Sequence, residues 1–123
     1  MNRTVSLICA ATLIAPLLFW SAAHAQTALT IDEARGVVAP LYEALNQPAK
    51  KDVAALLEKA ASPNWQSCGA NDQCAPRERV IAGIKGRGET IPDLKWEIKE
   101  LLVTGNQVIV RGEASGTPLA PLP

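Results

Sequence analysis

The sequence has a single histidine, His24, among its 123 residues, and this residue lies in an amino-terminal segment that we expect to be removed. A chain without imidazole has no Ser-His or Cys-His nucleophile pair and lacks the ligand that most zinc sites use. The chain also lacks an excess of either charge, since 12 basic residues balance 12 acidic ones. This balance gives no electrostatic footprint for nucleic acid or an anionic membrane, so no nucleic-acid partner is expected.

The first 25 residues have the composition of a secretory signal peptide. Arg3 precedes an apolar run from Val5 to Trp20, and Ala23-His24-Ala25 forms a small-residue cleavage site. The run contains Pro16 and is shorter than the roughly 20 residues that span a bilayer. We therefore expect cleavage after Ala25 and no stable membrane anchor, the alternative being an uncleaved anchor. Residues 26–123 would then form one domain in the periplasm or outside the cell.

The part of the chain after the signal peptide keeps two cysteines, Cys68 and Cys74, in the stretch CGANDQC. Export places them where disulfides persist, so a local disulfide is the favoured interpretation and two free thiols are the alternative. Two thiolates without a histidine supply only half of a tetrahedral zinc site, and the spacing is not that of a C-x-x-C redox pair. We expect no metal, and nothing in the sequence implies a cofactor.

Three helical segments are predicted before residue 90. Thr30 opens a capping box, and the apolar residues that follow recur every three or four positions. Pro48 is well placed to begin a second helix. Pro76 would begin a third helix that ends within the glycine-rich stretch 83–88. Between the second and third helices, a loop is expected to lead into a short strand near Trp65.

The clearest pattern in the sequence predicts a long β-hairpin near the carboxyl end. Apolar and charged residues alternate with a period of two from residue 94. Gly105-Asn106 is then a two-residue turn signal, and apolar residues return after it. The two expected strands cover residues 94–103 and 107–117.

The turn fixes an expected register for this hairpin. It places Glu100 opposite Arg111, as a cross-strand ion pair, and Ile98 opposite Glu113. An isolated two-stranded sheet leaves a strand edge unpaired. The sequence therefore predicts either further strands or a homodimer that forms through the sheet.

Two stretches, VVAPLYEALN and IPDLKWEIKELLVTGNQVIVRGEASGTP, resemble the SnoaL-like ester cyclase family, which belongs to the nuclear-transport-factor-two-like superfamily. The likeness covers about residues 31–118, and its most specific part is the pattern P-D-x-x-x-x-I…G-x-x-V-x-V-R-G-x-x-x-G-T. The resemblance implies an α+β fold in which N-terminal helices pack on a curved antiparallel sheet that closes as a cone around an apolar pocket. In the family further strands follow the G-T pair, where this sequence reads GTPLAPLP. The resemblance therefore implies that residues 26–123 hold the N-terminal part of the domain only.

The same resemblance implies a small-molecule pocket with acid/base chemistry like that of polyketide cyclases, acting on a small apolar or cyclic molecule. The acid/base residues of the family lie mostly in the later strands, so no catalytic residue is assigned to this chain. One alternative is a non-catalytic binding module for a small apolar ligand. Another is a truncated remnant without activity.

Five residues are candidates for a pocket. Trp65, with Gln66 beside it, matches the segment that enters the pocket in the family, and Trp65 would stack on a flat ligand or pack in the core. Trp96 faces one side of the sheet, where core packing is the simpler interpretation. Tyr42 lies one position past the helical apolar stripe, so its hydroxyl would reach a pocket or stay half-buried. Arg111 matches the R of V-x-V-R-G and would either orient a carbonyl or carboxylate or form a surface pair with Glu100.

Overall fold

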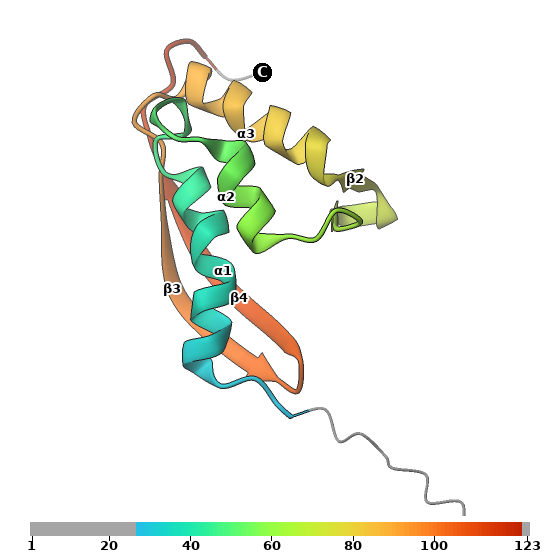
Figure 1. The fold of residues 1–123 in the computed structure, drawn as a ribbon. Helices are drawn as coiled ribbons and strands as arrows, with labels where there is room; N and C mark the ends of the chain where they lie inside the picture. The colour runs from blue at the N-terminus through green and yellow to red at the C-terminus, as the bar shows by residue number, and fades with distance from the viewer. Residues whose placement is uncertain (1–26, 122–123) are drawn as a thin grey trace, which may run out of the picture.

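The computed structural model describes residues 27–121, so the expected signal peptide and its cleavage site lie outside the described residues. In this range the elements follow one another as α1 (Ile31–Leu45), a 3-10 turn η1 (Pro48–Lys50), α2 (Val53–Ala60), β1 (Gln66–Cys68), a 3-10 turn η2 (Ala70–Asp72), β2 (Cys74–Pro76), α3 (Arg77–Thr90), β3 (Lys95–Thr104) and β4 (Gln107–Ser115). Each strand pair forms its own two-stranded antiparallel sheet. The expected mixture of helices and antiparallel sheet is confirmed (Figure 1).

Helix α1 links the other helices to the long hairpin. Its capping box is present, because the Thr30 side chain accepts a hydrogen bond from the Glu33 amide and the Glu33 carboxylate accepts one from the Thr30 amide. This exchange satisfies amides that have no partner inside a helix. The helix lies lengthwise along the β3–β4 hairpin (Figure 1) and also packs on α2. Ala34 and Ala44 on this helix are fully buried.

The hydrophobic core sits where the three helices meet, away from the tip of the hairpin. Its buried members are Ala44, Val53, Leu57 and Ile84. Small residues on α1 let α2 pack closely, and aliphatic side chains of α2 and α3 complete the core. No helix within residues 27–121 is long and apolar enough to cross a membrane.

Two helix boundaries differ from the expectation. Pro48 begins only the short turn η1, and α2 starts at Val53, where the Asp52 carboxylate accepts a hydrogen bond from the Ala55 amide. Helix α3 does not end among its glycines but continues to Thr90. Burial explains the difference, because Gly88 is buried directly against η1. Tertiary packing therefore outweighs the weak helix propensity of glycine there.

The long hairpin turns at Gly105-Asn106 as expected, with Thr104 opposite Gln107 and Glu100 opposite Arg111. The expected pairing of Ile98 with Glu113 is wrong, because a register shift between Ile98 and Glu100 places Ile98 opposite Gly112. One extra residue on β3, Lys99, is the signature of a β-bulge.

The short hairpin is closed by the expected disulfide. Cys68 and Cys74 lie opposite each other in β1 and β2 and are bonded, with their Cα atoms 4.0 Å apart. Helix α3 starts immediately after β2. The disulfide therefore fixes the segment that follows Trp65 to the beginning of α3.

Candidate functional site

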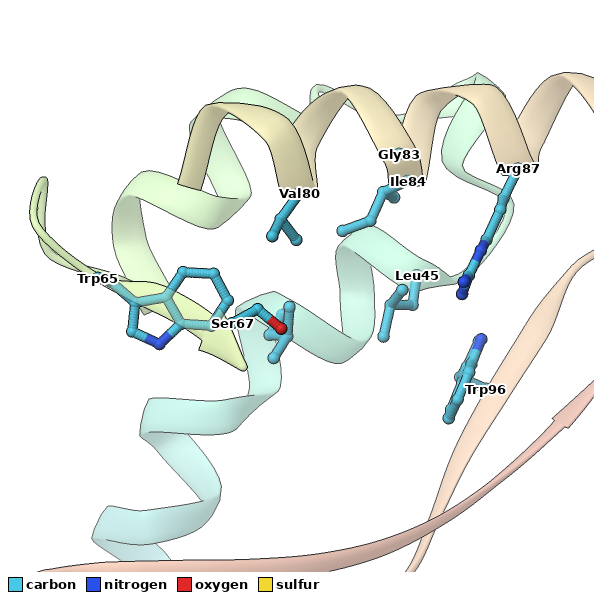
Figure 2. Close-up of a pocket in the computed structure, with 9 residues that line it drawn as sticks. Leu45, Trp65, Ser67, Val80, Gly83, Ile84, Arg87 and Trp96 are labelled. Atoms are coloured by element: carbon cyan, nitrogen blue, oxygen red, sulfur yellow. The ribbon is translucent and has the colours of Figure 1, made fainter. Parts of the chain in front are cut away.

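A cavity of about 380 Å³ lies between α1, α3, the disulfide hairpin and β3. Figure 2 shows it as a space roofed by α3, with α1 below, Trp65 on one side and Trp96 on the other. Its lining is mainly apolar and comprises Leu41, Leu45, Trp65, Ser67, Val80, Gly83, Ile84, Arg87 and Trp96. A concave apolar space with a few polar groups is the usual form of a small-molecule site.

Helix α3 supplies one wall of the cavity from a single face. Val80, Ile84 and Arg87 follow one another at four- and three-residue spacing, which places them on the same side of a helix. Gly83 lies between them and leaves open space, since a Cβ built on it would have no atom within 4 Å. The first residue of the helix is also anchored, because Arg77 Nη1 donates to the carbonyl of Ala61 at 3.0 Å.

Trp65 and Ser67 form the side of the cavity that lies across from Trp96 (Figure 2). The Trp65 amide donates to the Ser62 carbonyl at 3.0 Å, which turns the chain after α2 and directs it into β1. β1 is held against β2 by the disulfide. The indole of Trp65 is half-buried and faces the cavity (Figure 2).

Hydrogen bonds to its backbone and packing against its ring hold Trp96 in place. The Asn46 side chain accepts from the Trp96 amide at 2.8 Å and donates to the Trp96 carbonyl at 3.1 Å. Tyr42 packs edge-on against the indole, with ring centroids 6.4 Å apart. Burial raises the pKa of the Tyr42 hydroxyl, so this group stays neutral across the ordinary pH range.

Among the residues that line the cavity, Trp96 contributes a buried polar atom, its indole nitrogen. Trp96 Nε1 is buried and has no hydrogen-bond partner within the described range 27–121. In Figure 2 this nitrogen points toward the end of Arg87, which reaches down from α3. Two donors that face one space suit an oxygen acceptor between them, because a buried donor without a partner is costly.

The structure brings two of the five candidate residues to the cavity wall, Trp65 and Trp96. Tyr42 supports Trp96 from α1 without lining the cavity. Gln66 lies in β1 and is exposed. Arg111 lies on the hairpin with 60% of its side chain exposed, and its Nε is 3.3 Å from Glu100 Oε2.

Arg87 is the functional candidate that the sequence patterns did not single out. A signal was present, since Val80, Ile84 and Arg87 share one helical face and place a cation at the end of an apolar stripe. The glycines around Arg87 concealed it, because they predicted that the helix ends earlier.

The cavity lining combines aliphatic and aromatic side chains with a few polar groups. Among the described residues that line it, none carries a carboxylate or an imidazole, the groups that most often transfer protons in enzymes. The lining supplies aromatic faces for contact and two donors for orientation. Comparisons with protein-family models, with curated proteins and with solved structures find no match to this chain.

Proposed function

We propose that this chain is an exported, SnoaL-like pocket protein that binds a small apolar or cyclic molecule carrying a carboxylate or carbonyl group. The observation that carries the proposal is the cavity of about 380 Å³ in which the unpartnered Trp96 indole N–H faces Arg87. This volume falls within the range of roughly 300–1,000 Å³ that is typical of ligand pockets. The aliphatic lining and Trp65 would hold the apolar body of the ligand.

The family resemblance supports the architecture in this proposal. A SnoaL-like domain has helices that pack on the inner face of an antiparallel sheet around a pocket, and here α1 packs on β3 beside an apolar cavity. The Cys68–Cys74 disulfide supports export, because disulfides persist mainly in oxidising compartments.

Binding is favoured over cyclase-like catalysis because the described residues that line the cavity supply donors but no carboxylate or imidazole. A cyclase of this kind needs a general base within hydrogen-bond distance of the proton that it removes. The guanidinium of Arg87 carries hydrogen-bond donors and no acceptor. It therefore orients an anion or polarises a carbonyl, and it does not serve as the base.

The proposal is tested with two probes of the same shape, 2-naphthoate and the neutral hydrocarbon 2-methylnaphthalene. We expect both to bind, and the carboxylate to bind more tightly. Arg87→Gln should weaken 2-naphthoate binding by roughly tenfold, since a charge-assisted hydrogen bond is lost. The affinity for 2-methylnaphthalene should stay nearly unchanged. Isothermal titration calorimetry for the carboxylate and NMR titration for the hydrocarbon measure these affinities.

Two variants make this test specific. Arg79→Gln removes an exposed arginine from the same helix outside the cavity, and it should leave both affinities unchanged. Gly83→Leu places a side chain in the open space of the cavity, and it should reduce the binding of both probes. Equal weakening by Arg79→Gln and Arg87→Gln, or no binding of either probe, would contradict the proposal.

A further inference from the structure

The two edges of the long hairpin differ in how they are covered. The outer edge of β3 is bonded at Trp96, where the Asn46 amide imitates a neighbouring strand by pairing with both the N–H and the C=O. The Leu94 carbonyl just before β3 also accepts a hydrogen bond, from the Gln47 amide. Within residues 27–121, β4 pairs with β3 only, and its outer edge has no such partner.

The hairpin register identifies which groups of β4 point outward. In an antiparallel ladder, pairs that exchange hydrogen bonds alternate with pairs whose N–H and C=O groups point away from each other. Trp96 uses these groups to bond Asn46, so the Trp96–Ala114 pair is of the second kind. Alternation along β4 then gives Ala114, Gly112 and Val110 outward-pointing groups. A strand edge of this kind is a template for pairing with another chain.

Charged side chains on β4 discriminate between the ways in which two copies of this edge can pair. Arg111 and Glu113 lie on the same face of the strand, and their side chains are 60% and 64% exposed. A two-fold axis at Arg111 would oppose two arginines, and an axis at Glu113 would oppose two glutamates, both of which are unfavourable. An axis at Gly112 places each Arg111 opposite a Glu113, twice in one interface.

We propose that β4 pairs antiparallel with β4 of a second copy of this chain, about a two-fold axis at Gly112. Arg111 then lies opposite Glu113 of the partner subunit, and Val110 opposite the partner's Ala114. The two hairpins form one four-stranded sheet, which is a closed, isologous dimer. This proposal rests on the hairpin edge and is independent of the ligand-binding cavity.

The test is a charge-swap series followed by sedimentation equilibrium, on protein purified from cells that express all 123 residues of the sequence. The original chain should be a dimer that dissociates on dilution. Arg111→Glu and Glu113→Arg each create two like-charged pairs across the axis, and each should weaken the dimer by roughly tenfold or more. The double variant restores opposite charges at the axis and should return the dimer toward its original affinity.

A matched control separates dimerisation from hairpin stability. Glu100→Arg breaks the Glu100–Arg111 ion pair within one chain, as Arg111→Glu also does. It leaves the charges of β4 unchanged, so the dimer should persist. Ala114→Pro removes an outward-pointing N–H without removing a bond of the hairpin, and it should give a monomer. A monomeric original chain, open-ended larger assemblies, or a double variant that is no tighter than the single variants would overturn the proposal.

Discussion

At the scale of single residues, Gly88 shows how close packing limits which side chain a position can hold. A Cβ built on Gly88 would lie 2.7 Å from the Ala49 amide nitrogen and 2.9 Å from Pro48 Cγ. The first of these atoms is backbone, which cannot move aside easily, and Pro48 is itself buried. The contact between α3 and η1 therefore requires glycine at this position.

Gly88→Ala should lower the free energy of unfolding by about 1–3 kcal/mol, because the added methyl group overpacks this contact. Gly86→Ala is the matched control on the same helix, since nothing lies within 4 Å of its Cβ position. It should raise stability by about 0.5–1 kcal/mol through helix propensity. Urea unfolding measures both values, and equal effects of the two substitutions would show that Gly88 is not closely packed.

The two arginines Arg111 and Arg87 show what the sequence can and cannot predict at this scale. The hairpin turn predicts that Arg111 faces Glu100, and the structure confirms this pair. Arg87 required knowledge of where α3 ends, which depends on the buried contact of Gly88 rather than on local propensity. A long-range contact thus decides whether a residue that looks like part of a loop becomes part of a cavity.

At the scale of elements, the bulge in β3 was recognisable in the sequence. Leu94, Trp96 and Ile98 occupy alternate positions, but the next apolar residue is Leu101, so the two adjacent polar residues between them break the period of two. The bulge absorbs one residue and keeps the apolar side chains on one face. It also sets Glu97 opposite Glu113.

Lys99 compensates for these opposed carboxylates. Its Nζ lies 2.6 Å from Glu97 Oε2 and 3.5 Å from Glu113 Oε2, and Lys95 also pairs with Glu97. Hydrogen bonds with Lys95 and Lys99 lower the pKa of Glu97 from its usual 4.5 to about 2. The ionised form is therefore favoured in the folded protein.

Because the pKa of Glu97 is lower in the folded chain than in the unfolded chain, its contribution to stability is present above pH 4.5 and disappears as the pH falls toward 2. Glu97→Gln should therefore be less stable than the original chain at neutral pH, and the difference should shrink through this window. The side chains are exposed, so added salt should also reduce the difference. Unfolding at several pH values measures this, and a difference that grows on acidification would contradict the prediction.

A second prediction at this scale concerns the disulfide between β1 and β2. Replacing Cys68 and Cys74 together by serine should cost about 2 kcal/mol of stability, because a short loop gains little from closure. It should also weaken 2-naphthoate binding, since β1 carries the Trp65 wall. Non-reducing mass analysis checks the bond itself, and two thiols that alkylate without reductant would contradict it.

At the scale of the whole molecule, the sequence order predicts the class of fold correctly. Helical periodicity followed by strand alternation indicates an α+β arrangement, and the residues on each side of Gly105-Asn106 define the hairpin. The cavity could not be predicted in this way, because its walls come from four elements that are distant in the sequence. Its polar end depends on how Asn46 sets the position of β3 relative to α1.

If the cavity binds a ligand as proposed, the Trp96 indole N–H donates a hydrogen bond to an oxygen atom of that ligand. The sequence has three tryptophans, Trp20, Trp65 and Trp96, so the few indole N–H signals in an ¹⁵N-resolved NMR spectrum can be assigned with Trp96→Phe. Adding 2-naphthoate should move the Trp96 signal downfield, as expected for a new hydrogen bond, and 2-methylnaphthalene should not. A Trp96 signal that stays fixed while 2-naphthoate binds would contradict the account.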